Sequence, residues 1–308
     1  MTSAGSLRGG VMLAATGMAW GGMFPVIKQL LPHLDPVSLT LLRFGLSIPV
    51  LVLLLMVVEG RKALSTGGRM LQLWWLGTLG FAGFGLLLVL GVQSTRPEHA
   101  AVVPALMPLI AVVVTALRER TRPQVPALAA IALAALGVLL VVSRGDPAQL
   151  LQVGTGRGEI LVLLGAVCWV LYTLGAGRFP GWSGLRYTTL TLGFGTITIL
   201  AVELVALATG LARWPAMSAI PELAPAMGYL VLVASVMGFL FWNAGMAAIG
   251  PKRGVLFINL VPVTAFAVAL LKGHVPNMAE IMGVACVIAA LGINSVSRPR
   301  TRSDRVRG

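Results

Sequence analysis

The chain has 308 residues, of which 57% are hydrophobic and 11% are charged, and its formal net charge is +13. Soluble domains carry about 25% charged residues, so this composition excludes a soluble globular protein and indicates a multi-pass protein in a lipid bilayer. At about 20 apolar residues per transmembrane helix, the length allows about ten spans and no separate soluble domain. Basic residues collect in the cytoplasmic loops of membrane proteins, so the positive charge does not call for a nucleic-acid partner.

Five apolar segments predict the transmembrane helices of the first half: residues 11–31, 36–58, 71–94, 98–117 and 125–143. The first segment holds Pro25 and Lys28 where a signal peptide would need its cleavage site, so we interpret it as a retained span. Trp20, Phe24 and Lys28 recur every four residues and therefore share one helix face. Arg43 lies inside the second predicted span.

Five further segments predict the helices of the second half: residues 158–177, 185–209, 225–249, 251–272 and 278–296. Trp169 and Tyr172 share a face of the sixth span, and Trp169 corresponds roughly to the position of Trp20 in the first half. Glu203, late in the seventh span, is the one clear carboxylate within a predicted span. The eighth span carries Phe239, Trp242 and Asn243.

An internal repeat organises the chain. Residues 97–118 align without a gap with residues 251–272, so that Pro108 falls on Pro262 and Arg118 falls on Lys272. An odd number of spans in each half means that the second copy enters the membrane upside down, as in transporters built from inverted repeats. The predicted units are residues 8–144 for the first repeat, 145–157 for a linker, 158–298 for the second repeat and 299–308 for a basic tail.

The basic residues predict the orientation. When the ten spans alternate, sixteen Lys and Arg residues fall on the side of the two termini and six fall on the other side, with Arg43 inside a span. Because cytoplasmic loops carry the excess of Lys and Arg, both termini are expected in the cytoplasm. The expected fold is therefore an all-α membrane protein of ten transmembrane helices.

This pattern resembles the drug/metabolite transporter superfamily, specifically its ten-span members built from two EamA-type repeats. The resemblance is carried by Trp20, Phe24 and Lys28 in the first span, by Pro36 and Arg43 in the second, and by the proline-bearing fourth and ninth spans. It implies a central cavity lined by spans one to four and six to nine, with spans five and ten at the periphery. Within the superfamily the chain looks most like bacterial exporters of amino acids and related metabolites, which implies the bacterial inner membrane.

The candidate substrate site is a set of aromatic and polar residues near the middle of the spans. Aromatic faces can hold an apolar side chain or a cation, and the amide of Asn243 suits the amino or carboxyl group of a zwitterion. Alternatives remain open: aromatic packing against lipid, Lys28 reaching to the interface, or Arg43 as a structural tie. The candidates are Trp20, Phe24, Lys28, Arg43, Gln93, Trp169, Tyr172, Phe239, Trp242 and Asn243.

Prolines in the repeated spans predict the moving parts. Pro104, Pro108 and Pro262 each remove a backbone hydrogen bond, and the loosened helices could act as gates or could be static kinks. Glu203 is the candidate coupling residue, because a proton-driven transporter needs a titratable group inside the membrane. The resemblance implies a mid-membrane glutamate in the first span of the small multidrug pumps, and this chain has none there, so we expect a facilitator.

Catalytic and metal chemistry is not expected. The two cysteines lie within predicted spans and the three histidines share no spacing typical of metal ligands, so we expect no metal, no cofactor and no enzyme activity. The preferred function is export or facilitated passage of small amphiphilic metabolites, above all neutral or aromatic amino acids, by alternating access. The alternatives are a proton-coupled drug-efflux or sugar-phosphate carrier of the same superfamily and, remotely, an integral-membrane enzyme. A monomer and a homodimer both fit the Ala/Gly faces of spans five and ten.

Overall fold

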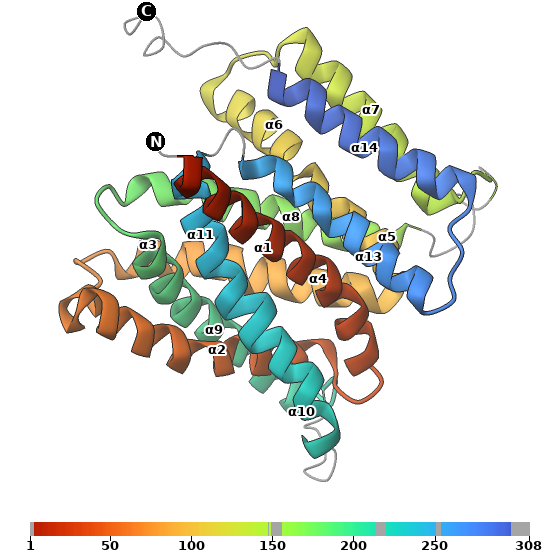
Figure 1. The fold of residues 1–308 in the computed structure, drawn as a ribbon. Helices are drawn as coiled ribbons and strands as arrows, with labels where there is room; N and C mark the ends of the chain where they lie inside the picture. Colours follow the sequence, from red (N-terminus) through yellow and green to blue (C-terminus); the bar gives the residue numbers. More distant parts are fainter. Residues whose placement is uncertain (1–2, 147, 149–155, 213–219, 251–253, 297–308) are drawn as a thin grey trace, which may run out of the picture.

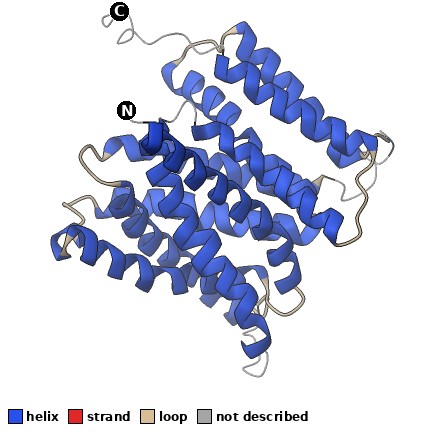
Figure 2. Ribbon diagram, in the orientation of Figure 1, coloured by secondary structure: helices blue, strands red, loops and turns tan. Residues whose placement is uncertain are grey.

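A computed structural model of the chain describes residues 3–146, 148, 156–212, 220–250 and 254–296. The predicted tail 299–308, most of the linker 145–157 and the first three residues of the second repeat copy lie outside this range. Several of the basic residues counted for the orientation lie outside it as well. Within the described residues the regular structure is all helical, as Figure 2 shows, so the all-α prediction is confirmed.

The first half forms five helical spans, two of which change their winding on the way. They are α1 (Ser3–Leu30), α2 (Pro36–Glu59), the continuous run α3 (Met70–Gly77), η2 (Thr78–Gly83) and α4 (Phe84–Ser94), the run α5 (Pro97–Val102), η3 (Val103–Leu106) and α6 (Met107–Glu119), and α7 (Val125–Ser143). A short helix, η1 (Arg61–Leu64), follows α2. The segment η2 is a π-helix and η3 is a 3₁₀-helix.

The second half repeats this series. It consists of α8 (Arg157–Gly175) with η5 (Ala176–Arg178), α9 (Gly184–Ala208), the run α10 (Ile220–Gly228), η7 (Tyr229–Met237) and α11 (Gly238–Ile249), the run η8 (Val255–Asn259) and α13 (Leu260–Leu271), and α14 (Met278–Val296). The π-helix returns as η7 in the third span of this half, and the 3₁₀-helix returns as η8 in the fourth. Eight helical segments are long and apolar enough to cross a membrane, and two shorter apolar helices, Val255–Leu271 and Met278–Ala290, complete the ten.

The two halves have opposite polarity. Lys28 at the end of α1 donates to the backbone carbonyl of Thr95, and the Thr95 hydroxyl donates to Glu159 at the start of α8. The end of the first helix of one half therefore meets the start of the first helix of the other. Helices of one half pack against helices of the other half. The first span of each half packs against the third span of the other half, as α1 with α11 and α8 with α4. The second spans, α2 and α9, pack together, and so do the fifth spans, α7 and α14. We call the side where α1 ends and α8 begins the distal side.

The pair α7 and α14 lies at the edge of the helix bundle (Figure 1). Glycines allow this contact. A Cβ added to Gly137 would lie 2.5 Å from the carbonyl oxygen of Gly283, and a Cβ added to Gly283 would lie 2.5 Å from the carbonyl oxygen of Gly137. Small residues allow helix backbones to approach closely in a membrane. The small-residue faces of predicted spans five and ten thus contact each other within one chain.

A second glycine contact joins α3 to α9 beside the centre of the molecule. A Cβ on Gly77 would lie 2.1 Å from the carbonyl oxygen of Thr191, and one on Gly195 would lie 2.3 Å from the carbonyl oxygen of Gly77. Neither distance can be accommodated without moving a backbone. The glycines of the third span thus set how closely the two halves pack.

Candidate functional site

Aromatic side chains from both halves meet at the centre of the molecule. The ring of Trp20 on α1 lies 6.5 Å from Trp169 on α8 and 5.1 Å from Trp242 on α11. Trp169 in turn lies 5.1 Å from Phe84 and stacks at 6.1 Å on Phe239. The roughly corresponding tryptophans of the two repeats therefore face each other, and four helices contribute to one aromatic wall.

Arg43 brings a positive charge into this wall. Its side chain is 3% exposed, its guanidinium carbon lies 4.8 Å from the centre of the Phe44 ring, and its Nε donates to the hydroxyl of Ser235 at 2.9 Å. Among the described residues, no carboxylate oxygen lies within 4.0 Å of the guanidinium. A buried charge is costly unless it is paired, so this guanidinium is a strong candidate to bind an anionic group.

The π-helix η7 positions both Trp20 and Arg43. Its wider turn pairs each N–H with the carbonyl five residues back, and it presents a backbone acceptor to Trp20 and a side-chain acceptor to Arg43. The indole Nε1 of Trp20 donates to the Ala234 carbonyl at 2.9 Å, and the next residue, Ser235, accepts from Arg43. The irregular winding of the eighth span therefore fixes the orientation of both cavity residues.

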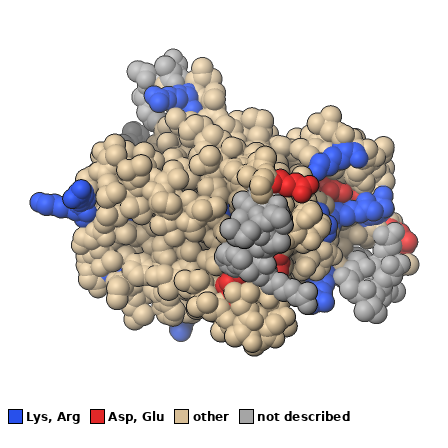
Figure 3. Space-filling view, turned by 90° about the horizontal axis from the view of Figure 1, so that it is seen from below, with Lys and Arg blue, Asp and Glu red and all other residues tan. Residues whose placement is uncertain are grey.

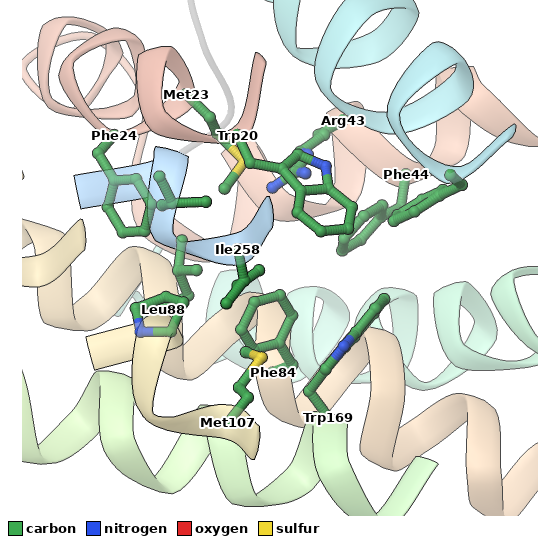
Figure 4. A pocket seen from close by; sticks show the side chains of 13 residues that line it. Trp20, Met23, Phe24, Arg43, Phe44, Phe84, Leu88, Met107, Trp169 and Ile258 are labelled. Carbon is green, nitrogen blue, oxygen red and sulfur yellow. The ribbon is translucent and has the colours of Figure 1, made fainter. Parts of the chain in front are cut away.

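These side chains enclose a small cavity, shown in Figure 4, where Trp20, Arg43 and Trp169 surround its centre. Its volume is about 40 Å³, far below the roughly 300–1,000 Å³ of typical small-molecule pockets. The site is therefore closed around its centre in this conformation and must widen to accept a metabolite. Its lining consists of Trp20, Met23, Phe24, Arg43, Phe44, Phe84, Leu88, Pro104, Met107, Trp169, Phe239, Ile258 and Val261.

Two adjoining cavities share Trp169 with the central one. One, of about 150 Å³, includes Tyr172, Trp242 and Asn243, and the other, of about 170 Å³, includes Trp20, Trp242 and Pro108. The amide nitrogen of Asn243 is 3.3 Å from the Thr188 hydroxyl. Because Trp169 borders all three cavities and Trp20 borders two of them, rotation of these indoles would change how the spaces connect.

The structure places two predicted site residues outside these cavities. Lys28 donates from Nζ to the carbonyl oxygens of Val92, Gln93 and Thr95 at 2.9, 2.9 and 2.8 Å. All three ammonium hydrogens are thus used where α4 ends, and a cation there also suits the helix dipole. The side chain of Gln93 lines a separate cavity on the distal side.

Replacing Lys28 with methionine is expected to lower stability more than substrate affinity. The substitution leaves three carbonyl groups at the partly exposed end of α4 without their donor, and each such hydrogen bond contributes about 0.5–1.5 kcal/mol net. We expect a free energy of unfolding lower by about 2 kcal/mol and a nearly unchanged KM in the folded fraction. Thermal unfolding in detergent and uptake by reconstituted protein measure the two effects. Lys28→Arg, which keeps the donors, is the control, and a large rise in KM with normal stability would instead place Lys28 at the substrate.

The predicted hinge prolines lie in or beside the 3₁₀ segments. Pro104 is part of η3 and lines the central cavity, while Pro108 follows at the start of α6 and lines an adjoining one. Pro262 is buried in α13 just after η8. Glu203, the predicted coupling residue, is 1% exposed, and its Oε1 lies 2.5 Å from the hydroxyl oxygen of Ser38.

Several cavity residues were not predicted from the sequence. Met23, Phe44, Phe84 and Met107 line the cavity, and Ser235 holds Arg43. The first four are ordinary apolar residues of membrane helices and carry no separate signal. A charged side chain in a span needs a partner, which predicts a residue of the kind of Ser235 but not its position.

Buried polar residues also connect the distal ends of three helices, which the sequence did not predict. His99 on α5 contacts Glu280 on α14 at 2.9 Å and Glu159 on α8 at 3.9 Å. Arg144 and His274 each approach Glu280 at 3.5 Å. These polar contacts join the first helical turn of the fourth span to the peripheral tenth span.

Comparison with known proteins agrees with this architecture. The sequence profile of the EamA-like transporter family matches residues 7–143 and again residues 156–296. The chain belongs to the EamA-like transporter family. It is therefore an integral, multi-pass membrane protein and a transporter, as the resemblance in the sequence indicated.

Relatives of this EamA-like transporter extend over nearly its full length. The uncharacterized transporter YrdR of Bacillus subtilis is 29% identical over 292 residues, which cover 94% of this chain and 91% of that protein. A probable terminal-alkyne amino-acid exporter of Streptantibioticus cattleyicolor is 23% identical, with 91% and 90% of the two chains covered. A solved crystal structure shares the fold with a TM-score of 0.64 and 20% identity over the whole of both chains.

Proposed function

We propose that this transporter carries neutral amino acids with aromatic or large apolar side chains, in the outward direction, across the bacterial plasma membrane. The observation that carries the proposal is the central cavity, which combines tryptophan and phenylalanine rings with one buried guanidinium that has no carboxylate partner among the described residues. A relative named as a probable amino-acid exporter supports the same substrate class.

The chemistry of the cavity matches the three parts of such a substrate. A guanidinium binds a carboxylate through two parallel hydrogen bonds, and among the described residues Arg43 hydrogen-bonds to protein through Nε alone. The indoles of Trp20 and Trp169 offer flat apolar faces to the side chain. An ammonium group is attracted to the same aromatic faces, so a zwitterion needs no buried acid.

The proposed movement uses the irregular segments of the repeats. η3 with Pro104 and η8 ahead of Pro262 occupy matching places in the two halves and both adjoin the cavity region. Since 3₁₀ segments and prolines weaken the hydrogen-bond ladder of a helix, bending there would widen one side of the closed centre while the other stays shut. Inverted repeats supply the two equivalent arrangements.

The proposed orientation places both termini in the cytoplasm. In Figure 3 the acidic side chains lie toward the right of the view, while the left end carries only Lys and Arg among its coloured residues. The right of this view corresponds to the distal side in Figure 1. Lys and Arg lie toward both ends of this view, so the proposed orientation rests on the count of basic residues, sixteen on the side of the termini against six on the other side.

Uptake of labelled tryptophan, phenylalanine and leucine into liposomes that contain the purified protein tests the substrate. We expect saturable uptake that the other two amino acids inhibit, and we expect Trp169→Ala to lower kcat/KM at least about tenfold, since an aromatic contact is worth about 0.5–1.5 kcal/mol beyond its buried area. Trp75→Ala removes a tryptophan that is 55% exposed and is the matched control. Inhibition by organic cations without any uptake of amino acids would favour the drug-efflux alternative.

A further inference from the structure

Three polar groups form a chain that crosses from α2 to α9 on the distal side. The Ser38 hydroxyl lies 2.7 Å from Oδ2 of Asp35 and 2.5 Å from Oε1 of Glu203. Asp35 caps the start of α2, and Glu203 lies in the last turns of α9. Ser38 is fully buried and Glu203 is 1% exposed, so the chain links the two helices inside the protein.

The two contacts of Ser38 require one extra proton. A serine hydroxyl has one hydrogen to donate, and an ionised carboxylate can only accept. Ser38 can therefore donate to one of its two carboxyl partners, and the other must itself carry an O–H that donates to the serine oxygen. Two ionised carboxylates cannot make both contacts.

The proton belongs on Glu203. Asp35 already accepts the backbone N–H groups of Val37 and Ser38, each at 3.0 Å, and lies at the positive end of the α2 dipole, which stabilises its ionised form. Glu203 has no such donors, and its Oε2 is buried without a hydrogen-bond partner among the described residues. A buried, unsatisfied carboxyl oxygen is much less costly on a neutral acid than on a carboxylate.

No Lys, Arg or His side chain on the described neighbouring elements lies close enough to neutralise the second carboxylate in place of this proton. Helix α9 packs against α2, α3, η2, α11 and η1, and α3, η2 and α11 contain no charged side chain. On α2, Arg43 is held by Ser235 and Glu59 accepts from Ser183 at the opposite end. The charges of η1 are near that opposite end as well. Within the described residues, no Lys, Arg or His nitrogen lies within 4.0 Å of either carboxyl group.

A cavity supplies access for water. It has a volume of about 1020 Å³ and lies on the distal side, where Asp35 and His33 line it together with Val202 and Ala206, which flank Glu203 on α9. Asp35 is half-buried and Glu203 is not exposed, so a proton from this cavity reaches Asp35 first. Among the described residues that line the cavity, the exposed His33 is the other titratable group.

We propose that Asp35, Ser38 and Glu203 form a proton-binding site that couples transport to proton movement from the distal side. A proton from water joins Oδ2 of Asp35, Asp35 donates it to the Ser38 oxygen, and Ser38 passes its own hydrogen to Oε1 of Glu203. Asp35 is then a carboxylate again, the hydroxyl is restored and Glu203 is a neutral acid. Loss of the proton leaves two like charges facing each other, which drives α2 and α9 apart on this side.

Infrared difference spectroscopy of the protein in lipid tests the site without any substrate. We expect a C=O stretching band of a protonated carboxylic acid at neutral pH that is lost in Glu203→Gln and shifted in Ser38→Ala. Glu119→Gln, which removes an exposed glutamate at the end of α6, is the control and should leave the band unchanged. The same band in wild type and in Glu203→Gln would overturn the proposal, and loss of the band on adding Na⁺ at constant pH would replace the proton by a metal cation.

A second experiment tests coupling and separates it from the choice of substrate. In proteoliposomes with a preset pH difference, coupling of one proton to one substrate molecule drives an accumulation of about tenfold per pH unit. We expect this in wild type, whereas Glu203→Gln should exchange substrate without responding to the gradient. Wild-type exchange that ignores the gradient would overturn coupling. The infrared result stands or falls independently of which amino acid is carried.

Discussion

Arg43→Met is expected to abolish most transport and, at the same time, to make the protein more stable. Among the described residues, Arg43 is the one charged side chain that lines the central cavity, and the methionine removes it. Truncating one partner of a buried charge pair costs about 2–5 kcal/mol. Transport of amino acids should therefore fall at least about thirtyfold in kcat/KM, which corresponds to about 2 kcal/mol.

The rise in stability follows from the same buried charge. The guanidinium is 3% exposed and has one hydrogen bond to protein and no carboxylate partner among the described residues. Replacing buried ionic groups with well-packed apolar ones of similar volume often stabilises a protein by about 1–4 kcal/mol. We expect the free energy of unfolding of Arg43→Met to exceed that of wild type by about 1–2 kcal/mol.

Two measurements on the same preparation check this pair of effects. Uptake into liposomes gives kcat/KM, and thermal unfolding in detergent gives the change in stability. Arg43→Lys keeps a charge but not the two-pronged geometry, and it should retain partial transport. If Arg43→Met instead unfolds more easily and its folded fraction transports normally, Arg43 is a structural tie to Ser235 rather than a substrate ligand.

Gly195→Ala is expected to lower the free energy of unfolding strongly. Gly193→Ala, on the same helix, is expected to raise it slightly. A Cβ at Gly195 would lie 2.3 Å from the carbonyl oxygen of Gly77, whereas nothing lies within 4 Å of one at Gly193. Overpacking costs about 1–3 kcal/mol. The two atoms nearest to the added Cβ belong to the backbone of Gly77 and cannot rotate away, so we expect a loss of about 3 kcal/mol. At Gly193 alanine should add about 0.5–1 kcal/mol, because it loses less chain entropy than glycine.

Thermal unfolding of the two variants side by side measures this difference. Both substitutions add one methyl group two residues apart on α9, so expression, detergent and helix propensity are matched. Equal stability of the two variants would show that α3 and α9 are not in backbone contact at Gly77, contrary to the described packing.

The sequence predicted the fold well because the repeat and the apolar periodicity are encoded locally. Each span is a continuous apolar segment, and bilayer thickness fixes its length. Pro108 and Pro262 mark equivalent places in the two halves, so the inverted arrangement followed from the odd number of spans. The winding changes in η2 and η7 could not be predicted, since π-helices arise from packing rather than from a residue motif.

The site was predictable only where the side chain itself carries the signal. Trp20, Trp169 and Phe239 are large and aromatic, and the structure brings them to one cavity. Lys28 shares a helix face with Trp20 and Phe24, yet its ammonium turns to the end of α4. The surroundings of Glu203 depend on Ser38, which is 165 residues away in the chain, and one sequence does not show such long-range pairs.

The contact between α7 and α14 has a consequence for folding during synthesis. Helix α7 ends at Ser143, and α14 begins only at Met278. At roughly 5–20 residues per second, the ribosome needs on the order of ten seconds to synthesise the chain between them. During that time the face of α7 around Gly137 has no native partner. A nascent chain that stalls in the second half would therefore offer this face to other membrane helices, and the quality-control machinery could recognise it there.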